Sequence, residues 1–165
     1  MIKYRDILNT ITKLLFRSHN NIPIFTNSEE MSDGECFYVS LNPSMNKTDR
    51  RYINYRLIYV DIKYFLNEHD DKTKIYDMAT ELDKLFNGYI TVPEKIYSEE
   101  QKQKTRRINI KSNNIKFLKD DISDYLHYSI ELEFYDVKDL EFKKTKLMQN
   151  VFINDKEVKN GTSRD

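Results

Sequence analysis

The sequence predicts an α+β fold in which two amphipathic helices pack on an antiparallel β-sheet, in the order α-β-β-β-α-β-β-β. Apolar residues recur every three or four positions over residues 3–18, and again between Asp71 and Gly88, which is typical of amphipathic helices. Apolar and polar residues alternate over residues 126–134, which is typical of a half-buried strand. The remaining elements fit between these three.

The first helix is predicted over residues 3–18, and its apolar stripe contains Tyr4, Ile7, Leu8, Ile11, Leu14 and Leu15. A short strand is predicted at residues 22–26. The next strand alternates from Cys36 to Leu41 and is predicted to stop at Asn42-Pro43-Ser44, because these residues favour a turn. Residues 45–51 are then predicted as a charged connection.

A long strand is predicted from Tyr52 to Leu66, and its two halves follow opposite alternation. Ile58, Val60, Ile62 and Tyr64 share one face, whereas Ile53, Tyr55 and Leu57 share the other. Either a bulge switches the face of the strand, or the first half is covered on a side that the second half leaves to water. Another subunit could provide that cover.

Asp70 and Asp71 are predicted to open the second helix, and Gly88 to close it. Its apolar face contains Ile75, Met78, Ala79, Leu82, Leu85 and Phe86. A short strand at 89–92, an exposed polar loop at 94–106 and a strand at 107–118 with an irregularity at 112–114 follow. The inward residues of the last strand are Leu126, Tyr128, Ile130, Leu132 and Phe134.

We predict one domain, residues 1–137, followed by a C-terminal arm, residues 138–165. The arm contains apolar residues that fit no single period. Such an arm either needs a partner surface or folds on its own sheet.

Composition excludes several classes of protein. The chain has 27 basic and 27 acidic residues, so its zero net charge argues against bulk electrostatic binding of nucleic acid. Cys36 is the sole cysteine, which excludes an intrachain disulfide. Polar residues interrupt the N-terminal segment, and no stretch approaches the ~18 apolar residues of a spanning helix, so we expect neither a signal peptide nor a membrane partner.

No nucleotide-binding loop, dinucleotide fingerprint or Ser-His-Asp order is present, so we expect no enzyme, no metal and no cofactor. The Glu68-His69-Asp70-Asp71 segment suits helix capping better than metal binding, because side chains of adjacent residues mostly diverge. His127 could form a titrating pair with Glu131 or Glu133, although a solvated sheet face or a subunit contact is the simpler interpretation. Basic residues near Arg106 and Arg107 leave a small nucleic-acid-binding module as an alternative function.

The chain resembles the phage tail terminator family, found in long-tailed phages of Gram-positive bacteria and in headless phage-tail-like bacteriocins. The resemblance covers most of residues 1–153. The segments that carry it are the N-terminal helix with Ile22-Pro23-Ile24-Phe25-Thr26, Cys36-Phe37-Tyr38-Val39, Tyr55 to Phe65, Ile75 to Leu82, Asp124 to Leu132, and Leu147-Met148-Gln149-Asn150.

This resemblance implies a tail-terminator-like α+β fold and a structural, non-enzymatic function. It implies a homohexameric ring that caps the head-proximal end of the tail tube, stops tail growth and offers a surface to the head connector or a collar. In contractile tails the ring would also meet the sheath. The particle would assemble in the bacterial host cytoplasm. Another neck protein, such as a head completion or stopper protein, remains an alternative.

We expect the subunit, tube or sheath interface to lie in three segments: residues 47–59, the loop 94–107 and the arm 138–153. These segments are chosen by position and charge. The candidate residues are Lys47, Arg50, Arg51, Tyr52, Tyr55, Tyr59, Arg106, Arg107, Phe142, Leu147, Met148 and Phe152.

Overall fold

A computed structural model describes residues 2–30, 34–50, 53–67, 71–94, 104–119, 124–137, 151–153 and 156–158. Two helices and eight strands form within them. In chain order they are α1 (Tyr4–Ser18), β1 (Ile24–Phe25), a 3-10 turn (Ser28–Glu30), β2 (Cys36–Arg50), β3 (Ile53–Phe65), α2 (Thr73–Leu85), β4 (Tyr89–Glu94), β5 (Lys104–Lys119), β6 (Asp124–Val137), β7 (Val151–Ile153) and β8 (Lys156–Val158). The predicted order α-β-β-β-α-β-β-β is confirmed as far as β6.

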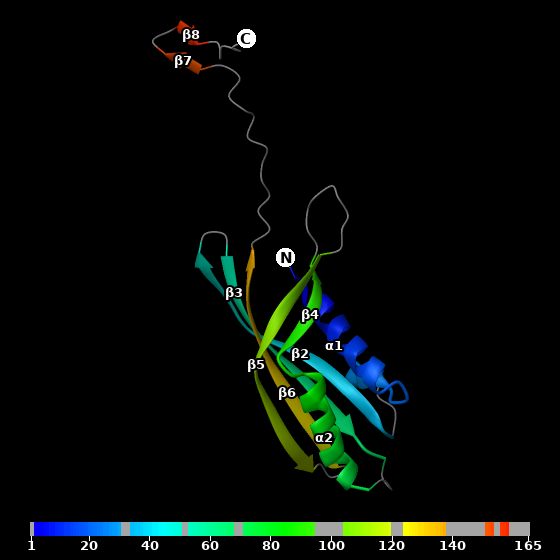
Figure 1. Cartoon of the computed structure of the whole chain (residues 1–165). Helices are drawn as coiled ribbons and strands as arrows, with labels where there is room; N and C mark the ends of the chain where they lie inside the picture. Colours follow the sequence, from blue (N-terminus) through cyan, green and yellow to red (C-terminus); the bar gives the residue numbers. More distant parts are fainter. Residues whose placement is uncertain are drawn as a thin grey trace.

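Six strands form one curled sheet in the order β1-β2-β3-β6-β5-β4 (Figure 1). Neighbouring strands are antiparallel except β1, which runs parallel to β2. The fold class is therefore confirmed as α+β, with a mixed rather than wholly antiparallel sheet. The strands β7 and β8 form a separate antiparallel pair, and the predicted division into residues 1–137 and 138–165 stays a prediction.

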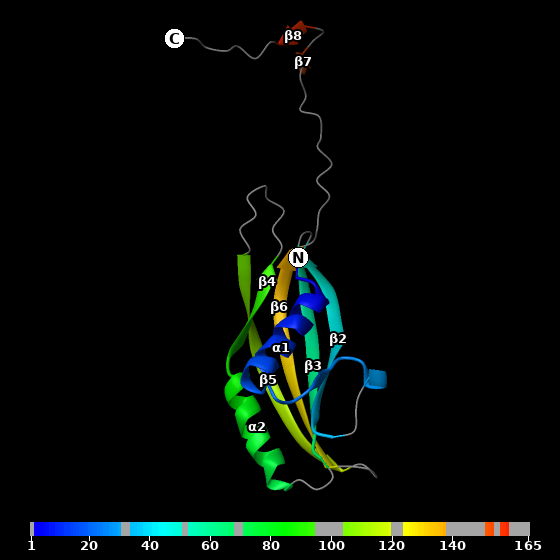
Figure 2. The same ribbon diagram turned by 90° about the vertical axis from the view of Figure 1, so that its right-hand side faces the viewer.

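The inner face of the sheet carries both helices. α1 contacts β1 and β2 on one side and β4 on the other, so the sheet curls around it (Figure 2). α2 packs on β6. The fully buried helical side chains Ile7, Ile11 and Leu15 meet the inward residues of the two central strands. Those inward residues include Ile58, Val60, Ile62, Tyr64, Leu126, Tyr128, Ile130, Leu132 and Phe134, as the alternation predicts.

A polar triad joins α2 to the sheet at Tyr128. The Tyr128 hydroxyl donates to Asp83 Oδ1 at 2.9 Å, and the Asn113 amide donates to the same carboxylate oxygen at 2.7 Å and to the Tyr128 hydroxyl at 3.1 Å. Burial is the main cause that raises the Tyr128 pKa to about 12; Asn113 lowers it, and Asp83 adds to the rise. The fold therefore favours the protonated phenol.

Because the folded pKa lies above the ordinary tyrosine value of about 10, this contribution to stability is complete below pH ~10 and disappears as the pH rises through about 12. We expect Tyr128→Phe to reduce the alkaline loss of stability over this range. Urea unfolding from pH 8 to pH 12 measures it. An unchanged pH dependence in Tyr128→Phe would contradict the assignment.

The second strand does not stop at Asn42-Pro43-Ser44, so that prediction is wrong. β2 continues to Arg50 and pairs with β3 over its whole length, and residues 45–50 belong to this strand rather than to a charged connection. Proline is tolerated because it lies at a register shift between Pro43 and Met45, in a strand that is an edge beyond Tyr38. In the described part of the chain, no strand pairs beyond Tyr38 with the edge of β2 that faces away from β3.

The long strand contains no bulge, so the first of the two alternatives, a switch of face within the strand, is wrong. β3 pairs with β6 from Ile53 to Phe65 without a register shift. The apolar residues of its first half therefore lie on the outer face, where Ile53, Tyr55 and Leu57 are half-buried. Arg56 takes the inward position and is buried.

The predicted irregularity in the fifth strand is confirmed. The register of β5 against β6 shifts between Ile110 and Ser112, directly before the predicted Ser-Asn-Asn segment. The second helix begins at Thr73, whose backbone N–H donates to Asp71 Oδ1 at 3.0 Å. Gly88 follows the helix with a φ of 92°, a conformation that glycine adopts without steric cost.

Candidate assembly interface

Four parts of the chain meet at one end of the sheet, which we call the hairpin end. There β2 turns into β3, with Arg50 opposite Ile53, and Ile53 in turn pairs with Val137 at the end of β6. The β4–β5 pair ends at the same place, where Glu94 faces Lys104. The N-terminus also lies here (Figure 1). The hairpin end therefore joins segments that are far apart in sequence.

An ionic cluster of the buried Arg56 and Asp136 and the half-buried Arg106 stabilises the hairpin end. Arg56 Nη1 donates to Asp136 Oδ2 at 2.9 Å and to the Ile2 carbonyl oxygen at 2.7 Å. The Ile2 N–H donates to Asp136 Oδ2 at 3.2 Å. Arg106 Nη1 lies 3.6 Å from Asp136 Oδ1, and its Nη2 donates to the Tyr135 carbonyl oxygen. The N-terminal segment, β3, β5 and β6 are thus linked through one carboxylate.

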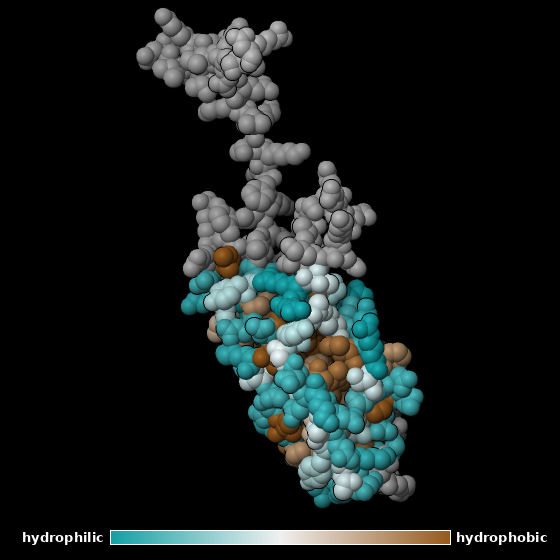
Figure 3. Space-filling model, viewed as in Figure 1, coloured by the Kyte–Doolittle hydropathy of each residue, from teal (hydrophilic) through white to brown (hydrophobic). Residues whose placement is uncertain are grey.

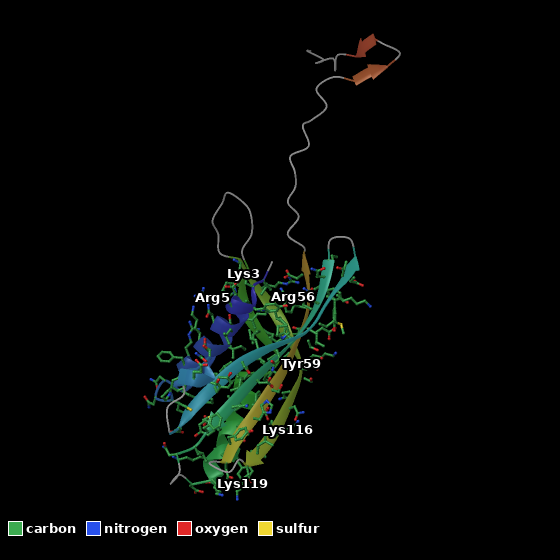
Figure 4. The ribbon with its side chains drawn as sticks, turned by 180° about the vertical axis from the view of Figure 1, so that it is seen from behind. Lys3, Arg5, Arg56, Tyr59, Lys116 and Lys119 are labelled. Carbon is green, nitrogen blue, oxygen red and sulfur yellow. The ribbon has the colours of Figure 1, made fainter. Side chains whose placement is uncertain are left out.

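Aromatic rings enclose the guanidinium of Arg56. Its Cζ lies 4.4 Å from the ring centre of Tyr4 and 5.4 Å from that of Phe134. Such cation–π contacts are stronger away from water, and only 7% of the Arg56 side chain is exposed. Figure 4 shows Arg56 near the same end as Lys3 and Arg5, with Lys116 and Lys119 at the opposite end. Arg56 is therefore held in one position on the inner face.

The outer face near the hairpin end carries an apolar area, which we call the outer patch. It consists of Met45, Tyr55, Leu57, Tyr59 and Tyr135. Registers place them together: Met45 faces Leu57, and Tyr55 faces Tyr135. The rings of Tyr55 and Tyr135 meet edge to face at 5.5 Å. Burial, followed by a hydrogen bond with Glu133, raises the Tyr55 pKa.

Charged pairs surround the outer patch on its other sides. Lys111 Nζ lies 3.2 Å from carboxylate oxygens of both Glu131 and Glu133, and these contacts raise the Lys111 pKa. A hydrogen bond from Ser112, with the help of Lys111, lowers the Glu131 pKa. His127 Nε2 lies 2.8 Å from Asp61 Oδ1, so the histidine contacts this aspartate rather than the two glutamates. The middle of the outer face is therefore polar.

A family model described as phage tail terminator protein matches residues 6–144. The chain belongs to the phage tail terminator family. No curated protein matches it significantly. One solved structure, recorded without a functional name, is 14% identical and resembles it with a TM-score of 0.46 over 81% of this chain and 92% of its own.

Membership of the family makes this tail terminator a structural, non-enzymatic component of a phage tail, and the resemblance found in the sequence is confirmed. The described residues contain no group of three or more His, Cys, Asp or Glu side chains placed to hold a metal ion. Of the predicted capping segment, residues 68–70 lie outside the described residues. Neither helix of the described part is long and apolar enough to span a bilayer.

The candidate interface residues of the terminator occupy several environments. Lys47 is exposed on β2, whereas Tyr55 and Tyr59 are half-buried members of the outer patch. Arg106 turns into the ionic cluster, while Arg107 is exposed, with its Cζ 4.7 Å from the ring centre of Tyr89. Of Arg50 and Phe152 only the backbone is described, in β2 and β7. Arg51, Tyr52, Phe142, Leu147 and Met148 lie outside the described residues.

Sequence reasoning missed Arg56, Asp136 and Tyr135. A signal for the first two was present, because each is a charged residue at an inward position of a strand with clear alternation. A buried charge requires a partner, so the alternation indicates that each of these residues has one, without indicating which. The position of Tyr135 opposite Tyr55 could be found only from the register in which β3 pairs with β6.

Proposed function

We propose that this tail terminator closes into a homohexameric ring on the head-proximal end of the tail tube. The ring stops tube growth and presents its free side to the head connector or a collar. In a contractile tail it also contacts the last ring of the sheath. A head-to-tail contact that closes by rotation gives a finite ring, and a ring stacked on a tube covers the otherwise exposed tube end.

The observation that supports this proposal is the meeting of distant segments at the hairpin end. The end of β2, the β4–β5 pair and the point where the arm begins lie together, on a scaffold fixed by the Arg56–Asp136 ion pair. An assembly surface benefits from such a rigid support, because less side-chain and backbone freedom is lost on binding. The space-filling view shows apolar areas separated by polar residues on the side seen in Figure 3.

Deletion of the gene in the producing strain tests the proposal. We expect tubes of irregular, excessive length in electron micrographs, and a return to uniform length when the full chain is supplied from a plasmid. The purified chain should form rings and bind the ends of purified tubes. Tails of normal length in the deletion strain would contradict the proposal. Binding to empty capsids in place of tubes would assign the chain to another position in the neck.

One of the two arginines considered for nucleic-acid binding, Arg106, instead contacts Asp136 and the Tyr135 carbonyl oxygen within the protein. Retention of the protein on DNA at low salt, lost as salt rises, would support that alternative.

A further inference from the structure

We propose that the outer patch is the docking site for the C-terminal arm of a neighbouring copy of this chain. This inference rests on the proposed ring, because the neighbour must lie beside the patch. The occupant is residues 138–153 of the second copy, and the site is formed by Met45, Tyr55, Leu57, Tyr59 and Tyr135.

The outer patch is unusual for a solvated sheet face. An antiparallel sheet with one face on the core normally carries polar residues on the other. The middle of this outer face follows that rule with Asp61, Lys63 and His127. In the patch, Tyr55, Leu57 and Tyr59 follow one another along β3 beside Met45 and Tyr135, and their other cross-strand neighbours include Lys47, Glu131 and Glu133. Tyr135 is 52% exposed and Met45 is 45% exposed. Apolar side chains gathered in this way favour a partner that removes them from water.

The arm begins beside the patch. Val137, the last residue of β6, pairs with Ile53, which lies two residues before Tyr55 on the same face of β3. The sequence then supplies apolar residues for an interface: Leu140, Phe142, Leu147, Met148, Val151, Phe152 and Ile153. The last three form β7, so this part of the arm adopts strand conformation. Arm and patch therefore have matching apolar character.

The direction of β6 favours a neighbouring copy over the same chain. The strand runs toward the hairpin end, so its last residue, Val137, lies beyond Tyr135 and the rest of the patch. To reach its own patch, a chain that continues from Val137 would have to turn back against the direction of β6. Residues 138–150 can instead span roughly 45 Å when extended, which is enough to reach an adjacent subunit.

The edge of β2 gives the arm a second means of attachment. Met45 belongs to this edge. Beyond Tyr38, no strand among the described residues pairs with the edge of β2 that faces away from β3. An extended segment can add to such an edge through backbone hydrogen bonds while its alternate side chains enter an apolar surface. The patch and the edge together therefore suit a strand such as Val151–Ile153.

Cysteine cross-linking between two different chains tests the inference. One chain carries Tyr135→Cys and the other Met148→Cys, and the two full-length chains are co-expressed and treated with a short bifunctional maleimide. The native Cys36 is 1% exposed, so it adds little background. We expect a cross-linked dimer from the mixture and none from either variant alone. A matched control replaces Tyr135→Cys by Lys116→Cys, an exposed outer-face position far from the patch.

The yield of dimer should exceed that control about tenfold or more, because docking raises the effective concentration of the arm at the patch. Rings seen by electron microscopy without this cross-link would overturn the docking inference and leave the proposed ring intact. A cross-link formed only within a chain that carries both cysteines would show that the arm folds on its own sheet, and would also overturn it. Absence of both rings and cross-link would overturn the inference and the proposed ring together.

Discussion

Replacing Arg56 by methionine is expected to lower the free energy of unfolding by about 3–5 kcal/mol, because it removes one partner of a buried ion pair. Asp136 is 2% exposed and would be left with the Ile2 N–H at 3.2 Å and Arg106 at 3.6 Å as partners. Methionine has a similar length to the arginine stem, so packing between Tyr4 and Phe134 is largely kept. Thermal unfolding should show a Tm lower by roughly 6–20 °C.

Two further variants make this prediction specific. The double variant Arg56→Met with Asp136→Leu should recover most of the lost stability, since an apolar pair of similar volume can replace a buried ion pair. Lys111→Met is the matched control: it removes a cation that contacts two glutamates of β6, but its side chain is 53% exposed, so water and salt screen the interaction. Equal losses of unfolding free energy in Arg56→Met and Lys111→Met would contradict the prediction that burial makes the Arg56–Asp136 pair the more important of the two.

The substitution Phe37→Ala is expected to cost about 3–5 kcal/mol of unfolding free energy, because it leaves a cavity where the first helix, β2 and β3 meet. Phe37 is fully buried, and its ring centre lies 5.5 Å from that of His19 and 5.2 Å from that of Tyr64. Its backbone N–H donates to the Pro23 carbonyl oxygen at 2.8 Å and is unaffected by the change. The loss therefore comes from packing alone.

Phe16→Ala provides the matched control, since the same atoms are removed from a side chain that is 60% exposed on α1. We expect a change within about 0.5 kcal/mol, and alanine is the better helix former. Urea unfolding of both variants at one protein concentration measures the difference, because assembly would otherwise change the apparent stability. If Phe16→Ala lost as much unfolding free energy as Phe37→Ala, the result would contradict the assignment of Phe37 to the core and of Phe16 to the surface.

Much of the fold could be predicted because periodicity reports directly which side chains turn inward. The two helices, the third and sixth strands and the irregularity near Ser112 all follow from local patterns. The end of β2 could not be predicted in this way. Asn42-Pro43-Ser44 is a turn signal in isolation, and only its position at a bulge in an edge strand makes it compatible with a continued strand.

The candidate interface was predicted less completely. The described parts of two of the segments chosen by charge and position, residues 47–50 with 53–59 and residues 104–107, do lie near one another at the hairpin end. Arg106 and Arg107, although adjacent in sequence, point to opposite faces, and only Arg107 is exposed. The roles of Arg56 and Tyr135 depend on pairing between strands that are some 80 residues apart. No local pattern contains that information.

By itself, the sequence determined the number and order of the main elements, their inward faces and the resemblance to tail terminators. Local periodicity and short motifs are sufficient for these features. Only the tertiary structure decided that β3 lies beside β6, and with it the pairing of Arg56 with Asp136, the meeting of Tyr55 with Tyr135 and the position of Val137, the last residue of β6, beside the outer patch. The physical reason is that side chains distant in sequence interact only after the strand order and register have brought them within a few ångströms.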